Sequence, residues 1–197
     1  MKSTFAALCV LAAVAAPQAA RAQGGLTEEQ FAEINCVYSG ISKLEDDAFY
    51  DVVDSTIQQV TEGELFERSS EHVLTITKSC ADKYEWDDTE VAMGISVGVY
   101  GAIVDATTGN LDEDGVLDAA LAAVDAAGEA MSDDDLGAVY DGKLFKDAAL
   151  RGRVVALLKA NGMPEVQAAT MQDTLTYLEA MTIGLVYTQD WIDYAGF

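Results

Sequence analysis

The feature that most limits how this chain can fold is the spacing of its apolar residues, which is helical along most of the 197 positions. Apolar side chains recur three and four positions apart, as in Phe31, Ile34 and Val37, and this spacing places them on one face of an α-helix. Proline, which breaks helices, occurs only at Pro17 and Pro164. The pattern therefore predicts an all-α fold, in which helices bury their apolar faces against one another.

Helix start and stop signals divide this pattern into a bundle of about seven or eight helices. In a capping box, two side chains three positions apart bond to free N–H groups at the start of a helix. The chain has this spacing at Thr27 and Gln30, and again at Asp87 and Glu90. Pro164 is expected at the first position of the last helix. We expect the helices near residues 27–44, 46–63, 69–84, 87–104, 116–131, 132–140, 145–159 and 164–191.

The fourth of these segments is uncharged over residues 91–104 and carries Gly94, Gly98 and Gly101. Glycine costs about 1 kcal/mol in a helix relative to alanine, so three of them on one side indicate close contact with a neighbour. A Gly-x-x-x-Gly pair also occurs where helices dimerise in membranes. We expect a central buried helix instead, because the run is too short to cross a bilayer, and we expect a loop over residues 105–115.

The first 22 residues have the three-part pattern of a secretory signal peptide. Lys2 supplies a positive start, an apolar run extends from Phe5 to Ala16, and small residues precede an A-x-A-type cleavage site that ends at Ala22. The apolar run is shorter than the roughly 20 residues that span a membrane. We therefore expect cleavage after Ala22 and a periplasmic or secreted protein. An N-terminal anchor that stays attached is the alternative.

The remaining residues, 23–197, are expected to form a single acidic all-helical domain with no transmembrane segment. The chain has 34 acidic and 11 basic side chains, and loss of the leader removes two bases and no acid, so the formal charge changes from −23 to −25. This charge argues against nucleic acid and anionic lipid as partners, because both require a basic face. It is compatible with a cation or a basic protein as partner, or simply with a well-hydrated surface. A high-salt habitat would also explain the acidity.

Two cysteines, Cys36 and Cys80, remain after cleavage. Outside the cytoplasm, two thiols in one chain favour an intramolecular disulfide. Closing a loop of this length would stabilise the fold by roughly 4 kcal/mol in the chain-entropy model. A redox site is less favoured, because it usually has a C-x-x-C spacing and an electropositive setting. Two buried free thiols are the other alternative.

Patterns that would indicate catalysis are weak in this chain. Residues 94–98 match the G-x-S-x-G pattern of serine hydrolases, but that motif requires a strand-to-helix turn and a later histidine as base. Here Ser96 falls within an expected helix, and the single histidine, His72, precedes it. We therefore expect no catalytic residue and no cofactor. The signature of a carboxylate-dependent enzyme would be a pocket with two or more acids away from helix starts, one with a raised pKa.

The segment from residue 110 to residue 118 resembles the front of an EF-hand calcium loop, with Gly115 at the sharp turn. Two departures weaken the resemblance: the first position is Asn, and the twelfth, Leu121, is not the usual bidentate Glu. An acidic loop that binds no ion is the alternative. The oxygen ligands would come from Asn110, Asp112, Asp114, the backbone of Val116, and Asp118.

These observations predict a non-enzymatic exported helical protein that acts by binding or by structural association. A role in acid or envelope stress is one version, because acidification toward about pH 4 would neutralise most carboxylates and change solubility or association. One alternative is a calcium-binding module that uses the incomplete loop at residues 110–121. The other is a carboxylate-dependent enzyme of unknown class.

The leader and the disulfide together predict a mass-spectrometric result. Protein purified from the export compartment should begin at Gln23 and should take up no alkylating reagent before reduction, because its two cysteines are paired. Reduction should then expose two thiols, since Cys9 leaves with the leader. Material that still carries Met1, or thiols that react without reduction, would contradict these expectations.

Overall fold

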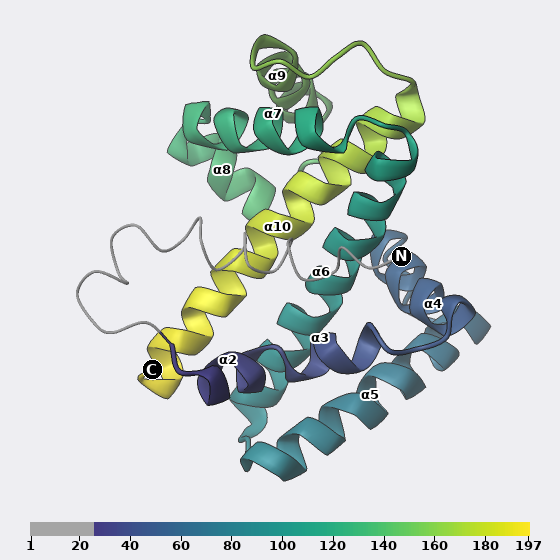
Figure 1. Cartoon of the computed structure of the whole chain (residues 1–197), viewed down its shortest axis with the longest axis vertical. Coiled ribbons are helices and arrows are strands. Elements are labelled where there is room, and N and C mark those ends of the chain that lie inside the picture. The colour runs from purple at the N-terminus through teal and green to yellow at the C-terminus, as the bar shows by residue number, and fades with distance from the viewer. Residues whose placement is uncertain (1–25) are drawn as a thin grey trace. The chain divides into compact units, whose positions relative to one another are not determined.

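The computed structural model describes residues 26–197, and within this range the chain forms nine α-helices and no strand (Figure 1). The predicted all-α class is therefore confirmed. The predicted signal peptide, residues 1–22, lies outside the described residues. The helices are α2 (Glu28–Ile34), α3 (Cys36–Ile41), α4 (Asp46–Ile57), α5 (Glu64–Tyr84), α6 (Asp88–Glu113), α7 (Leu117–Ala130), α8 (Asp133–Tyr140), α9 (Ala148–Ala160) and α10 (Ala168–Ala195).

The described chain divides into two compact units. Unit 1 comprises residues 26–103 and 184–197, and unit 2 comprises residues 104–183. Two helices, α6 and α10, contribute residues to both units. The expectation of a single domain over residues 23–197 stays a prediction, and the two units are treated separately below.

Both predicted capping boxes are present. At the start of α2, the Thr27 hydroxyl accepts the Gln30 N–H at 3.2 Å, and the Gln30 side chain accepts the Thr27 N–H at 2.8 Å. Before α6, the Asp87 carboxylate accepts the N–H groups of Thr89 and Glu90, and Glu90 accepts the Asp87 N–H at 2.8 Å. These bonds satisfy N–H groups that the first turn of a helix leaves free.

The loop predicted over residues 105–115 is wrong, because α6 continues to Glu113. The apolar face of the helix continues past the uncharged run: Val104 and Leu111 are almost fully buried in unit 2. The helix ends only where Gly115 adopts a positive φ of 70°, and the Val116 N–H then bonds to the Leu111 carbonyl at 3.0 Å. The polar residues of this segment predict a loop, but burial of its apolar residues keeps the segment helical.

Two other predicted boundaries are also corrected. Helix α5 begins at Glu64, and Ser69, expected near its start, is buried inside it. Helix α10 begins at Ala168, not at Pro164. After α9, the Met163 side chain is buried and its N–H bonds to the Leu158 carbonyl, which holds the chain in the turn that ends α9. The proline therefore lies in an extended link between two helices.

The predicted disulfide joins Cys36 on α3 to Cys80 on α5, with a Cα–Cα distance of 5.9 Å. It ties together residues 44 positions apart within unit 1. Helix α5 also packs against α4, so the bond lies in a group of three helices. The prediction of one structural disulfide is confirmed.

Unit 1 also contains an aromatic cluster formed by Trp86 and Trp191. The rings of Trp86 and Trp191 meet edge to face with centroids 4.9 Å apart, and Trp191 is fully buried. The indole N–H of Trp86 donates to the Glu33 carboxylate at 3.0 Å. The Tyr194 hydroxyl donates to Asp87 at 2.6 Å, so the last turns of α10 are attached to the cap of α6. Trp191 thus serves in packing, whereas Tyr194 is half exposed and attaches the segment through its hydroxyl.

The glycines of α6 permit close contact with α3 in unit 1. A Cβ atom on Gly98 would lie 2.5 Å from Cγ1 of Val37 and 3.0 Å from the backbone nitrogen of Tyr38. A Cβ on Gly101 would lie 2.8 Å from the Tyr38 ring. By length and composition α6 is also able to cross a membrane, but 61% of its most apolar stretch is buried inside the fold.

The close contact predicts opposite outcomes for two glycine substitutions on α6. Gly98→Ala should lower the free energy of unfolding by about 1–3 kcal/mol, because the added carbon meets backbone that cannot move aside. Gly109→Ala should be neutral or stabilise by up to about 1 kcal/mol, because no atom lies within 4 Å of the added carbon. Urea unfolding measures both. Equal effects at the two positions would contradict the packing.

Candidate functional site

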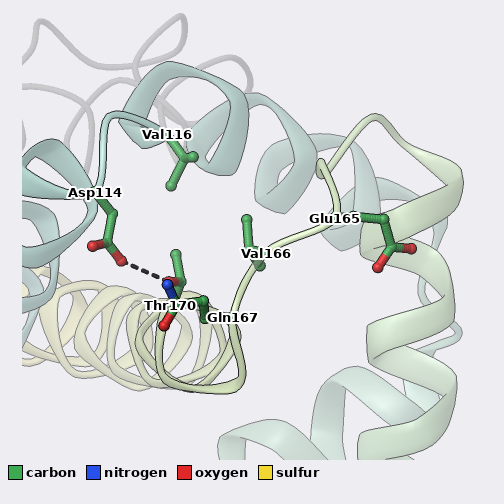
Figure 2. Close-up of a pocket in the computed structure, with 6 residues that line it drawn as sticks. All are labelled: Asp114, Val116, Glu165, Val166, Gln167 and Thr170. Carbon is green, nitrogen blue, oxygen red and sulfur yellow. Dashed lines mark hydrogen bonds between the residues drawn. The ribbon is translucent and has the colours of Figure 1, made fainter.

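An open hollow of about 450 Å³ lies in unit 2, beyond the end of α6 and beside the start of α10 (Figure 2). Its walls come from three stretches of the chain: the end of α6 with the link to α7, the extended link after Pro164, and the first turn of α10. Polar and apolar side chains alternate around it. The lining residues are Asp114, Val116, Glu165, Val166, Gln167 and Thr170.

One hydrogen bond connects two walls of this hollow. The Thr170 hydroxyl donates to Oδ2 of Asp114 at 2.6 Å, as Figure 2 shows. Thr170 is buried, whereas Asp114 is exposed, so the carboxylate is held from one side and open to solvent on the other. The bond joins residues 56 positions apart and fixes the start of α10 against the end of α6 within unit 2.

The second carboxylate of the lining has a different role. Glu165 accepts a hydrogen bond from Nζ of Lys159 at 3.1 Å, and 88% of its side chain is exposed. In Figure 2 its carboxylate points away from the centre of the hollow. Exposed ion pairs of this kind contribute about 0–1 kcal/mol. The negative charge that faces the hollow therefore comes from Asp114.

A third acid, Asp173, lies next to this hollow and was not singled out from the sequence. Partial burial raises the pKa of Asp173, a hydrogen bond from Asn110 lowers it, and the negative charge of Asp114 raises it. Asn110, Asp114 and Asp173 are thus neighbours in space. Asp173 follows Thr170 by three positions on one helical face, but it is 59 positions from Asp114, so no local pattern in the sequence connects them.

The residues predicted to bind calcium are distributed over two helices and the short turn between them. Asn110 and Asp112 lie in the last turn of α6, and Asp114 follows its end. Val116 is the N-cap of α7, and Asp118 lies in the first turn of that helix. Among residues 26–197, no group of three or more His, Cys, Asp or Glu side chains is arranged to hold a metal ion. Calcium binding here stays a prediction.

The residues that match the serine-hydrolase pattern, 94–98, lie inside helix α6, as predicted. Ser96 is in α6, and its hydroxyl donates to the Ala92 carbonyl at 3.0 Å, as helical serines commonly do. His72 lies on α5, which is part of unit 1, near Asp51, whose pKa is lowered by the hydrogen bond from Arg68. Ser96 is therefore not presented on a strand-to-helix turn.

Comparisons with known proteins give no relative. No protein-family model matches this chain, and neither the curated proteins nor the solved structures contain a match.

The Thr170–Asp114 bond predicts a specific loss of stability. Thr170→Val keeps the shape of the side chain but removes the hydroxyl, and should lower the free energy of unfolding by about 1 kcal/mol, because a bond to a charged acceptor is lost. Thr174→Val is the matched control one turn later. Its hydroxyl donates only to the Thr170 carbonyl, so its loss should matter less. Denaturant midpoints that do not separate the two variants would contradict a stabilising role for the bond.

Proposed function

We propose that this chain is an exported, periplasmic or secreted, acidic helical protein that acts by binding rather than by catalysis, and that the hollow in unit 2 receives a cation. The observation that supports this most directly is the geometry around Asp114. Its carboxylate faces a hollow of about 450 Å³, is held in position by Thr170, and has a second carboxylate, Asp173, as its neighbour.

Electrostatics favours a positively charged ligand. Unit 2 contains fifteen acidic and five basic side chains. Lys143, Arg153 and Lys159 already form ion pairs with acids of the same unit, so the remaining negative charge is largely uncompensated. Burial raises the pKa of Asp173, and the negative charge of Asp114 raises it further; a bound cation would relieve the repulsion between the two carboxylates.

Calcium is a second candidate ligand, and one observation favours it. The EF-hand-like segment has no acid at Leu121, its twelfth position. Asp173 supplies a carboxylate beside Asn110 and Asp114 from a different part of the chain. A carboxylate from α10 would thus take the place of the missing glutamate. The affinity would be lower than that of a complete loop, because the first position is the neutral Asn110 and not a carboxylate.

The carboxylate-enzyme alternative has less support. Its expected signature is a pocket holding two or more acids, one with a raised pKa. The acids that line the hollow are Asp114 and Glu165, and the second of these is turned toward Lys159. Asp173, whose pKa is raised, is beside the hollow and not in its lining. Binding therefore accounts for the arrangement more simply than catalysis does.

One form of this function is a role under acid or envelope stress. Acidification would neutralise the carboxylates of the hollow together with those of the surface, and would release a bound cation. Export is part of the proposal because it rests on the leader pattern of residues 1–22.

Calorimetric titration of the exported, processed chain with spermidine and, separately, with calcium chloride tests the function. We expect saturable binding of at least one probe at pH 7, at least tenfold weaker in Asp114→Asn because the charge facing the hollow is lost. Binding should also weaken as the pH falls toward 4, because carboxylates in general begin to take up protons there. The probe that gives the heat distinguishes the two ligand classes.

The control for this titration is Asp125→Asn, which removes the same charge from an exposed position of α7 in the same unit. It should bind as the unaltered chain does. Absence of heat with both probes, or equal weakening by the two substitutions, would refute the hollow as the binding place.

A further inference from the structure

Glu179 is half-buried in unit 2, and one of its two carboxylate oxygens is buried without a hydrogen-bond partner. It lies in α10 between Leu178 and Ala180, both of which are almost fully buried. Its Oε1 atom is buried and has no hydrogen-bond partner, a condition that among the described side-chain polar atoms only Nε1 of Trp191 shares. An ionised carboxylate normally accepts bonds at both oxygens, so this position disfavours the charged form.

The groups that face Glu179 come from the link between α8 and α9. The backbone N–H of Leu144 donates to the carboxylate, and the charge of Lys146 acts on it from the same link. Both favour the ionised form. Burial outweighs them and raises the pKa of Glu179 above the usual range for glutamate.

We propose that Glu179 is a proton sensor in unit 2: proton uptake by its carboxyl removes a partly buried charge and strengthens the packing of α10 on the link between α8 and α9. This inference does not rest on the hollow binding a ligand. It concerns a different residue and a different property, the pH dependence of unit 2.

The direction of the pH effect follows from the raised pKa. A carboxyl whose pKa is higher in the folded chain than in the unfolded chain holds its proton more tightly when folded. The folded state therefore gains stability as the pH falls through the folded pKa of Glu179, and loses it as the pH rises. Unit 2 is expected to be more stable in mild acid than at neutral pH.

Two other acids of unit 2 act in the opposite direction at lower pH. The bond from Arg153 lowers the pKa of Asp135, and the N–H groups of Leu150 and Ala149 lower that of Asp147. Their stabilising contributions are present above the pKa of an unfolded aspartate and are lost as the pH falls through their lowered values. Between pH 7 and about pH 5, above the range in which Asp135 and Asp147 are neutralised, the remaining shifted acids of unit 2 are Glu179 and Asp173. Burial raises the pKa of Asp173 as well, so the effect of Glu179 is read as the difference between the unaltered chain and a variant without its carboxylate.

Thermal unfolding of the full processed chain, followed by circular dichroism from pH 7 to pH 5, tests the inference. Glu179→Gln keeps the shape and removes the charge, so its midpoint should lie about 2–4 °C above that of the unaltered chain at pH 7. The difference should shrink as the pH falls, because the unaltered carboxyl then becomes neutral as well. A carbon-13 NMR titration of the Glu179 carboxyl reads its pKa directly.

The control separates this effect from relief of overall repulsion. Glu129→Gln removes the same charge from an exposed position in the last turn of α7. It is a conservative control, because loss of an anion at the C-terminal end of a helix is itself favourable. A shift for Glu179→Gln no larger than that for Glu129→Gln, or one that does not change with pH, would overturn the proposal.

Lys146 supplies a second, independent variant. Lys146→Gln removes the charge that favours ionised Glu179, so stabilisation on acidification should begin at a higher pH than in the unaltered chain. In the Glu179→Gln background the same substitution should leave the pH profile unchanged, because no carboxylate is then present to respond. A Lys146→Gln effect that persists without Glu179 would show that the lysine acts on another group and would overturn the assignment.

Discussion

The close contact of α6 with α3 is the constraint on which unit 1 depends. Side chains are absent from this side of α6 at Gly94, Gly98 and Gly101, and the vacated space is filled by Trp86, Val37 and Tyr38. The disulfide joins α3 to α5, and α3 also contacts α6 where Gly98 and Gly101 leave no room for a Cβ atom. Helix α3 is therefore held by both a covalent bond and a close packing contact. Glycine in a helix is costly, and dense packing is what offsets that cost.

Charge is the second constraint, because a chain with 34 acids and 11 bases has too few counterions to neutralise its acids by pairing. Most of the described acids are exposed to solvent, and Asp87 and Asp147 cap helices with their carboxylates. Unit 2 departs from this arrangement at two acids. Asp173 and Glu179 are partly withdrawn from water, and burial raises the pKa of each. These departures are where binding and pH sensitivity are proposed.

Local patterns predicted the fold class, the capping boxes of α2 and α6, and the pairing of Cys36 with Cys80. They failed at the end of α6 and at the start of α10. Residues 105–113 are polar enough to resemble a loop, and Pro164 is an acceptable first residue of a helix. Burial of Leu111 and of Met163 determined these boundaries, and burial depends on residues distant in the chain.

What the sequence by itself determined is therefore helix formation, helix capping and the Cys36–Cys80 disulfide, because each depends on side chains a few positions apart or, for the disulfide, on the few cysteines that the chain contains. Tertiary structure alone decided which acids became neighbours. Asp114 meets Thr170 and Asp173 across more than fifty positions, and Glu179 meets the link beyond α8. The physical reason is that a carboxylate's environment depends on what packs around it, and helical spacing carries no information about contacts between distant helices.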